Sequence, residues 1–251
     1  MDTGLEGKVA VVTGGGRDVG GEVCRSLAAE GVRVAVNYNS SKDEADALVA
    51  EIEAAGGTAR AAQADISDYG QVKAMIDGVA KDWGSVDILV NNAGYVKYQR
   101  FVESTPQDWK PQIDVCLYGA LNCSHAAAQH MVAQKSGRII NVVGDSSRIG
   151  EANISLAATA RGGTIALGKS MAKEFGRFNV TVNTVSLGLV KSAHQDPEFL
   201  ARNMDRILKA YPLKRIGEPG DIAPMVTFLS SAGASWVTGQ VISVNGGFAM
   251  V

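Results

Sequence analysis

The sequence predicts an α/β protein with a single doubly wound parallel sheet flanked by helices. Two observations predict this fold. Short apolar runs typical of buried strands alternate with amphipathic stretches typical of helices, and no Pro/Gly/Ser-rich linker interrupts the series. The chain has 251 residues, of which 46% are hydrophobic and 20% charged, which suits one α/β domain. We therefore expect a single domain over residues 1–251.

The expected elements follow one another along the chain. Strands are expected at residues 9–12, 32–36, 58–64, 86–90, 138–143, 180–185 and 241–244. Helical stretches are expected at residues 22–30, 43–55, 71–83, 107–134 and 154–175. The segment 192–213 departs from this rhythm just after a strand, where open α/β sheets bind ligands. It is therefore interpreted as a lid or substrate loop, or else as a surface insertion.

Charge and composition exclude several classes of function. The net charge is −2 and no basic cluster occurs, so a nucleic-acid partner is not expected. The N-terminus is acidic and polar, and no apolar run approaches the roughly 20 residues needed to span a bilayer. We expect a cytoplasmic protein without a membrane partner.

Cysteine and histidine positions give no sign of a metal site. Cys24, Cys116 and Cys123 cannot all pair, and their spacing matches no zinc pattern, so reduced, buried thiols are expected. His125 and His130 are five residues apart and do not share a helix face. No metal is assigned to these residues or to the isolated His194.

A glycine-rich turn follows the first strand and opens the first helix. Residues 13–20 read Thr-Gly-Gly-Gly-Arg-Asp-Val-Gly. In Rossmann-type folds such glycines let the backbone approach a pyrophosphate, and the helix N-terminus offers N–H groups to it. The turn indicates a nucleotide-binding ancestry for this half of the chain.

With this turn the sequence resembles the short-chain dehydrogenase/reductase family, whose glycine motif is Thr-Gly-x-x-x-Gly-x-Gly. Asn91-Asn92-Ala93-Gly94 matches a second family motif, and Asp65 matches the family's adenine-contacting Asp. Segments 215–223 and 238–247 are similar to its C-terminal signatures, so the likeness covers essentially the whole chain. It implies a Rossmann-type fold, an NAD(P) cofactor and an Asn-Ser-Tyr-Lys tetrad.

The four catalytic positions that this resemblance implies are all replaced. In active members the Tyr exchanges a proton with substrate, the Lys lowers its pKa, the Ser orients the carbonyl and the Asn supports a relay water. An ungapped alignment places Ala157 at the Tyr, Arg161 at the Lys, Gly144 at the Ser and Cys116 at the Asn. No tyrosine occurs between residues 119 and 210, so no shift of register restores one. No catalytic residue of the family's type is therefore expected.

Other candidate groups are weaker. Tyr38/Lys42 and Tyr69/Lys73 share the Tyr-x-x-x-Lys spacing but precede Asn91, so we interpret them as chance matches. Ser146 and Ser147 lie just past the expected serine position and are interpreted as turn formers. Arg161 could bind a carboxylate or phosphate, or form an ion pair.

Nucleotide binding is expected to be weak or absent. Asp18 replaces the motif's middle glycine and brings a negative charge beside the phosphates, so we expect it to cap the first helix instead. Leu187 replaces the proline of a family Pro-Gly pair. Asn37 and Tyr38 provide no acidic mark for NAD, so NAD or NADP is left open. The vestigial contacts would be Gly14, Arg17, Asp18, Val19, Asn37, Asp65, Asn92 and Gly94.

Three functions remain open at this point. The first is a non-catalytic subunit that supports a catalytically complete paralogue, an NAD(P)-dependent hydroxyacyl-CoA-type dehydrogenase, in a hetero-oligomer or alongside self-association. The resemblance places the assembly surfaces on the helices at 107–134 and 154–175 and on the C-terminal edge. The second is a lyase, isomerase or hydratase using Cys116, Asp145, Ser146 or Arg161, although no histidine is near in sequence to activate the thiol. The third is a ligand-binding sensor.

Overall fold

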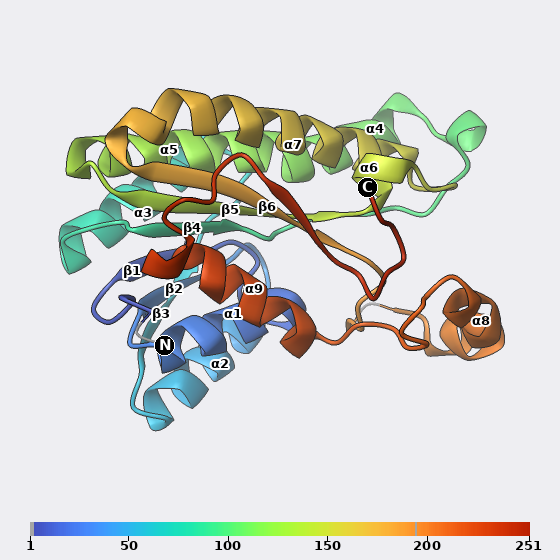
Figure 1. The fold of residues 1–251 in the computed structure, drawn as a ribbon, viewed down its shortest axis with the longest axis horizontal. Coiled ribbons are helices and arrows are strands. Elements are labelled where there is room, and N and C mark those ends of the chain that lie inside the picture. The colour runs from blue at the N-terminus through green and yellow to red at the C-terminus, as the bar shows by residue number, and fades with distance from the viewer. Residues whose placement is uncertain (1–2, 194) are drawn as a thin grey trace.

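The computed structural model describes residues 3–193 and 195–251, and its seven-stranded sheet has the order β3-β2-β1-β4-β5-β6-β7 (Figure 1). All neighbouring strands are parallel. The strands are β1 (Val9–Val12), β2 (Arg33–Tyr38), β3 (Thr58–Gln63), β4 (Ile88–Asn91), β5 (Gly137–Gly144), β6 (Val180–Leu187) and β7 (Val241–Val244). The order reverses between β1 and β4, which makes a topological switch point at their carboxyl ends. The predicted fold class is confirmed.

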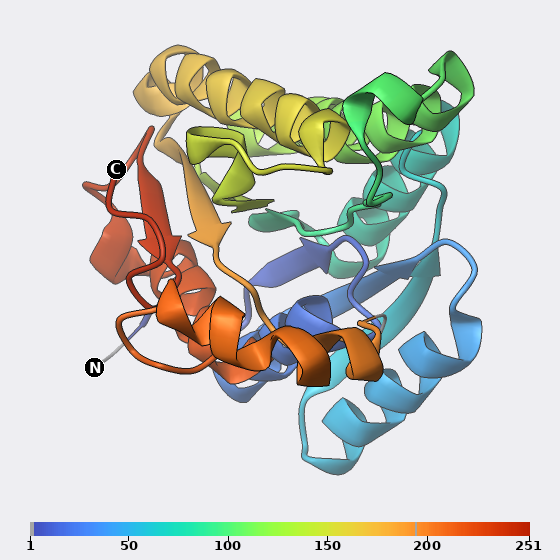
Figure 2. The same cartoon turned by 90° about the vertical axis from the view of Figure 1, so that its right-hand side faces the viewer.

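Helices cover both faces of the sheet (Figures 1 and 2). One layer contains α1 (Asp18–Ala29), α2 (Lys42–Ala54) and α9 (Pro219–Ser230). The other contains α3 (Tyr69–Trp83), α5 (Gly119–Gln134) and α7 (Ser155–Phe175). Successive residues of β1 alternate between the two cores, since Ala10 and Val12 pack in one and Val9 and Val11 in the other. A strand buried on both faces explains its uninterrupted apolar run.

The long helix expected at residues 107–134 is divided into three pieces. These are α4 (Pro106–Ile113), a π-helical turn (Asp114–Tyr118) and α5. Pro111 lies inside α4 and lacks the backbone N–H that a regular helix uses. Thr164 Oγ1 on α7 donates to the Cys116 carbonyl oxygen at 3.0 Å, so a side chain from another helix satisfies a carbonyl of the π turn. The turn therefore places residue 116 against α7.

The segment that breaks the strand–helix rhythm contains a helix, α8 (Pro197–Lys209). Figures 1 and 2 show it standing apart from both helical layers, at the edge to which the strands point. Val190 forms an isolated bridge with Gly217, which closes the base of the excursion. The segment is thus placed where a lid was expected.

The remaining short elements connect these layers. They are α6 (Ser146–Ile149) and the 3₁₀ turns Phe101–Glu103, Gly176–Phe178 and Ala232–Ala234. Helix α6 follows β5 directly and brings its serines to the carboxyl edge of the sheet.

Candidate functional site

The glycine turn after β1 is held in shape by an asparagine from the turn after β4. Gly14 has φ +58°, a conformation that glycine adopts freely. A Cβ added to Gly20 would lie 2.2 Å from the Gly14 carbonyl oxygen and 2.5 Å from Asn92 Nδ2. Asn92 Nδ2 donates to the carbonyl oxygens of Thr13 at 3.0 Å and Gly14 at 3.1 Å. The two turns therefore form one unit at the switch point.

Further hydrogen bonds join the same two turns. The Thr13 hydroxyl accepts the backbone N–H groups of Asn92 at 3.0 Å and Ala93 at 3.1 Å, and donates to the Val90 carbonyl at 3.3 Å. Asn91 Nδ2 donates to Asn141 Oδ1 at 2.9 Å, which ties β4 to β5. These motif residues stabilise the fold through contacts within the chain.

Asp18 does not cap the first helix, so that expectation is wrong. The N-cap residue of α1 is Arg17, and Asp18 lies inside the first turn with φ +49°. From this left-handed backbone the Asp18 carboxylate accepts the backbone N–H of Ala193 at 2.9 Å. Arg17 turns aside to Glu44, 3.1 Å away. The substituted glycine position thus connects the turn to the 192–213 segment.

Two other expected nucleotide contacts are used internally. Asn37 is buried, and its Nδ2 donates to the carbonyl oxygens of Ala62 and Ala64, both at 3.1 Å. Asp65 Oδ1 accepts the Ser67 N–H at 2.9 Å and the Ser67 hydroxyl at 2.7 Å. Both side chains are therefore already engaged within the chain.

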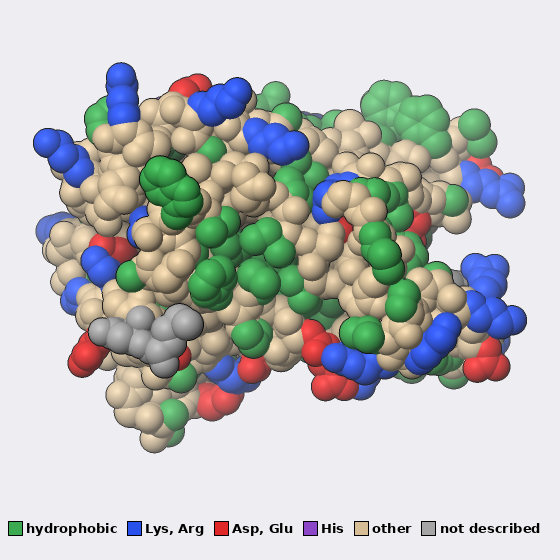
Figure 3. Space-filling model, viewed as in Figure 1, with side chains coloured by type: hydrophobic (Ala, Val, Ile, Leu, Met, Phe, Trp, Pro, Cys, Tyr) green, Lys and Arg blue, Asp and Glu red, His purple; other side chains and the backbone are tan. Residues whose placement is uncertain are grey.

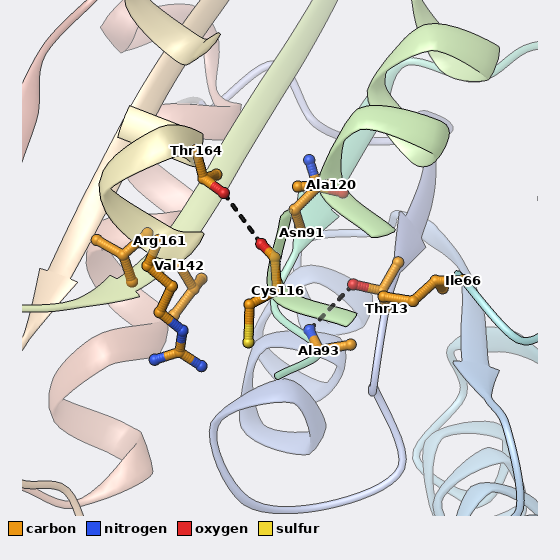
Figure 4. Close-up of a pocket in the computed structure, with 10 residues that line it drawn as sticks. Thr13, Ile66, Asn91, Ala93, Cys116, Ala120, Val142, Arg161 and Thr164 are labelled. Atoms are coloured by element: carbon orange, nitrogen blue, oxygen red, sulfur yellow. Dashed lines mark hydrogen bonds between the residues drawn. The ribbon is translucent and has the colours of Figure 1, made fainter. Parts of the chain in front are cut away.

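The structure brings two of the four replaced catalytic positions, Cys116 and Arg161, to one pocket (Figure 4). Cys116 and Arg161 line the same cavity of about 10 Å³, which has room for roughly one water molecule. A Cβ added to Gly144, the last residue of β5, would lie 3.8 Å from Arg161 Nη1. Ala157 is buried one helical turn before Arg161. The pocket presents a guanidinium and a thiol, with the Ala157 methyl group buried nearby on α7.

Arg161 extends from α7 into the space beside Cys116 (Figure 4). A Cβ added to Gly94 would lie 2.1 Å from Arg161 Nη2, so the guanidinium packs directly on that backbone. Throughout residues 3–193 and 195–251, no hydrogen bond or ion pair to this guanidinium is found. Arg161 therefore forms no ion pair with the described residues, which was one of its two expected roles.

The cysteines are buried and unpaired by disulfides, as predicted. Cys116 Sγ accepts the Tyr95 N–H at 3.4 Å and donates to the Tyr95 carbonyl at 3.3 Å. Burial raises the pKa of the Cys123 thiol to about 12 and that of Cys24 still further. The histidines nearest in sequence bond elsewhere, His125 to Tyr69 and His130 to Asp77. Nothing in these contacts activates a thiol.

Two tyrosines near the pocket were not anticipated. Tyr211 Oη accepts the Leu189 N–H at 2.6 Å. Tyr98 is 70% exposed, yet desolvation by neighbouring segments raises the pKa of its phenol, Glu151 raises it further, and Arg161 opposes both. A raised pKa is the opposite of what activates a phenol as a base. The position of Tyr98 just beyond Asn91-Asn92-Ala93-Gly94, at a strand's carboxyl end, could have indicated it.

The remaining candidates divide between the pocket and the outer helices. Ser146 Oγ lies 3.2 Å from the position of a Cβ on Gly144, whereas the Asp145 carboxylate is occupied, accepting from Ser186 Oγ at 2.6 Å and Asn245 Nδ2 at 2.5 Å. The lysines of the two chance Tyr-x-x-x-Lys matches form ion pairs with aspartates along their own helices. Neither match contributes to the pocket lining.

Neither a membrane span nor a metal cluster is found in the part of the chain that the structure describes. No helix there is both long and apolar enough to cross a bilayer. No group of three or more His, Cys, Asp or Glu side chains is placed to hold a metal ion. His194, which the sequence left isolated, lies outside the described residues.

Fold and site together define an α/β protein built on an oxidoreductase scaffold, with a glycine turn at the switch point of a parallel sheet. The profile of the family described as Enoyl-(Acyl carrier protein) reductase matches residues 15–249. The chain belongs to the short-chain dehydrogenase/reductase family of oxidoreductases.

Individual relatives support this membership. The chain is 42% identical over 247 residues to the 3-oxoacyl-[acyl-carrier-protein] reductase FabG of Staphylococcus epidermidis, covering 97% of this chain and 99% of the relative. It is 38% identical to the 3-oxoacyl-[acyl-carrier-protein] reductase of Synechocystis sp., covering 99% of each. A solved structure from Sinorhizobium meliloti, assigned as a short-chain alcohol dehydrogenase, superposes with a TM-score of 0.92 at 28% identity, covering 97% of this chain and 96% of that one.

Proposed function

We propose that this chain is a non-catalytic subunit that supports a catalytically complete paralogue, an NAD(P)-dependent dehydrogenase of the hydroxyacyl-CoA type. The observation that carries the proposal is Ala157. Its methyl group is buried on α7 where the family resemblance requires a phenol. The scaffold is retained around it, so the chain can fold and assemble without carrying out the redox reaction.

The size of the loss favours a scaffold over a slow reductase. A positioned acid or base contributes typically 10²–10⁴-fold to a rate. Gly144 additionally lacks the hydroxyl that would orient a carbonyl, and preorganised donors of that kind contribute substantially to catalysis. Arg161 cannot replace an ammonium whose role is to lower the pKa of an absent phenol. Little catalytic power would remain in the isolated chain.

Exposed apolar side chains on the C-terminal edge support a partner chain. Trp236 is 98% exposed and Met250 80% exposed, and Phe228 on α9 is partly exposed. Figure 3 shows hydrophobic side chains gathered on this face, where β7 forms the open edge of the sheet. Large exposed apolar groups of this kind mark protein–protein contacts. A related chain, or a second copy, would cover them.

Tight dinucleotide binding is not part of the proposal. Asp18 places a carboxylate on the glycine turn, and Arg161 Nη2 packs against Gly94. Asn37 and Asp65 are committed to contacts within the chain. These residues fit a dinucleotide poorly, so no step of the proposed role uses one. Weak binding of NAD or NADP is the most that we expect.

One setting with this division of labour is the heteromeric 2-[hydroxy(phenyl)methyl]succinyl-CoA dehydrogenase of anaerobic toluene degradation, a family member with an inactive subunit. We propose it as a specific candidate, with this chain in the inactive position of a heterotetramer. The pattern of losses at Cys116, Gly144, Ala157 and Arg161 is what supports it.

A second candidate function is non-redox chemistry in the same pocket. The structure disfavours it, because the Cys116 thiol bonds to the Tyr95 backbone and Asp145 is occupied by Ser186 and Asn245. Loss of a measured turnover in Cys116→Ala would support this reading. A ligand-binding role is compatible with a scaffold role and is taken up below.

Co-expression with a catalytically complete paralogue encoded nearby tests the proposal. We expect a mixed oligomer on affinity purification, visible by native mass spectrometry, with dehydrogenase activity confined to the complex. Trp236→Asp should weaken the assembly by placing a charge on the apolar edge. Lys42→Asp, on α2 beside the opposite edge of the sheet, is the control. Ordinary rates of ketone reduction by the isolated chain would overturn the proposal.

A further inference from the structure

The Arg161 guanidinium is a partly buried cation without an internal partner. It lies over Gly94 at the bottom of the pocket, and no carboxylate in residues 3–193 and 195–251 forms an ion pair with it. Glu151 and Arg161 both act electrostatically on Tyr98, but Glu151 does not bond to the guanidinium. Asp145 is occupied by neutral donors.

An unpaired charge that has lost part of its water is energetically unfavourable unless an opposite charge restores the balance. An arginine is always charged, so it cannot relieve this situation by losing its proton. Its planar fork of N–H donors matches the two oxygens of a carboxylate or a phosphate. The guanidinium is therefore suited to a ligand that supplies an oxyanion.

A second donor lies beside the same space. The position of a Cβ on Gly144 would be 3.2 Å from Ser146 Oγ and 3.8 Å from Arg161 Nη1. The Ser146 hydroxyl forms no hydrogen bond with any described side chain or backbone group. Because residue 144 is glycine, the space between these two groups holds no side chain. A hydroxyl and a guanidinium thus face one point from two elements, α6 and α7.

We propose that Arg161 and Ser146 form a binding site for an oxyanion, the carboxylate of a small organic acid or a phosphate, over Gly144. The cavity of about 10 Å³ holds no more than a water, so the ligand lies outside it, in the space over Gly144 that Ser146 Oγ and Arg161 Nη1 border. The fork of Arg161 binds two oxygens, and the Ser146 hydroxyl donates to one of them. The loss of a catalytic lysine has produced a receptor for an anion.

This site does not depend on a partner chain. It deepens the ligand-binding role named above and is tested on the purified chain alone. If the chain binds oxyanions but never joins a paralogue, the scaffold role fails while the anion site stands. If it joins a paralogue but binds no oxyanion, the anion site fails while the scaffold role stands.

Calorimetric titration of the full chain tests the site, with sodium acetate, sodium succinate and inorganic phosphate as probes against sodium chloride at equal ionic strength. We expect saturable binding of at least one oxyanion by the wild-type chain. Arg161→Ala should weaken it by about 10- to 100-fold, the usual range for hydrogen bonds between charged groups, and Ser146→Ala by about 3- to 10-fold, the usual range for a single neutral hydrogen bond. Lys173→Ala removes a cation from the far end of the same helix and should leave binding unchanged.

The variants also separate fork geometry from charge. Arg161→Lys keeps the charge but loses the bidentate fork, so its affinity should lie between those of Arg161→Ala and the wild type. Circular dichroism confirms that each variant is folded, and the lysine variant serves if the alanine variant is not. Binding of phosphate alone, or of carboxylates alone, identifies the ligand class within the proposal. Equal affinity of wild type, Arg161→Ala and Arg161→Lys, or no binding by the wild type, would overturn it.

Discussion

The turns after β1 and β4 differ sharply from the positions on β5 and α7 at which the family resemblance places reactive groups. In the turns, family motif residues keep their identity, and Asn92 and Thr13 join the two loops by several hydrogen bonds. At the positions on β5 and α7, the residues are Gly144, Ala157 and Arg161. The motif residues of the turns form hydrogen bonds within the chain. The family resemblance gives the replaced positions a role toward a substrate instead.

A family motif can be evidence for the fold or evidence for the chemistry, and the two differ in this chain. Asn92 supports the glycine turn whether or not a nucleotide binds, so its presence is evidence for the fold. A catalytic tyrosine has no such second role, so its absence at residue 157 is evidence about chemistry. Family membership is therefore secure here while activity must be tested separately.

Restoring the phenol and ammonium should have the largest effect. We expect Ala157→Tyr combined with Arg161→Lys to raise reduction of a 3-oxoacyl thioester by roughly 10²–10⁴-fold over the wild-type chain, measured as NADPH oxidation. Ala157→Phe with Arg161→Lys is the matched control, since it adds the ring without the hydroxyl and should gain nothing. Equal rates for the two double variants would show that the phenol is not the missing group.

A methyl group added at Gly20 should show how much the close packing of the two turns contributes to stability. Its Cβ would lie 2.2 Å from the Gly14 carbonyl oxygen, so we expect Gly20→Ala to lower the free energy of unfolding by about 1–3 kcal/mol. Gly78→Ala on α3 meets nothing within 4 Å and should instead stabilise by about 0.5–1 kcal/mol. Urea denaturation measures both. A Gly20→Ala variant as stable as wild type would mean that the two turns are not tightly packed.

Removing the carboxylate at residue 18 should increase the affinity of the glycine turn for a nucleotide. We expect Asp18→Gly to tighten NADH binding about tenfold, because a unit charge a few ångströms from a phosphate opposes binding by about 1 kcal/mol or more. Asp18→Asn keeps the side chain and removes its charge, so it separates repulsion from steric hindrance. Fluorescence titration measures the affinities. No gain in either variant would place the obstacle elsewhere, with Arg161 the next residue to test.

Acid should weaken the N-terminal capping boxes of α9 and α4, which lie outside the two compared regions, and this is the smallest of the expected effects. Hydrogen bonds from Arg215 and the Glu218 N–H hold the pKa of Asp221 at about 2, in the capping box of α9. Lys97 and Thr105 do the same for Asp108 in α4, again to about 2. A lowered pKa means that the stabilisation is complete above the ordinary value near 4 and is lost as pH falls toward 2.

Melting temperatures measured from pH 6 down to pH 2 check this. Asp221→Asn and Asp108→Asn should each melt lower than wild type at neutral pH and should lose less stability over that range. Asp43→Asn, at the exposed start of α2, is the control. Unchanged acid sensitivity in both variants would show that the two capping boxes contribute little to stability.

Much of the fold was predictable from the sequence because buried strands leave continuous apolar runs. The seven strands, the single sheet and its parallel direction follow from that pattern. The division of the helix at residues 107–134 was not predicted, and the hydrogen bond from Thr164 to the Cys116 carbonyl at the π turn joins residues 48 apart in sequence. Local sequence patterns contain no record of such a tertiary contact.

The site was predictable as a set of positions, but its contacts were not. The resemblance placed Cys116, Gly144, Ala157 and Arg161 together. In the structure Cys116 and Arg161 line one pocket, Gly144 lies beside Arg161, and Ala157 is buried one turn earlier on the same helix. The bond from Ala193 to Asp18 joins residues 175 apart in sequence, so a local capping rule misassigned that carboxylate. The unpaired state of Arg161 likewise depends on tertiary placement, since Asp145 bonds to Ser186 and Asn245, and Glu151 does not reach the guanidinium.

The Asn92 side chain, which joins the turns after β1 and β4, holds these turns together without a bound ligand. This amide donates to two carbonyl oxygens of the glycine turn. The switch point of the sheet therefore has these hydrogen bonds as soon as the chain folds. The shape of this loop is therefore set by the polypeptide itself and needs no small molecule to hold it in place.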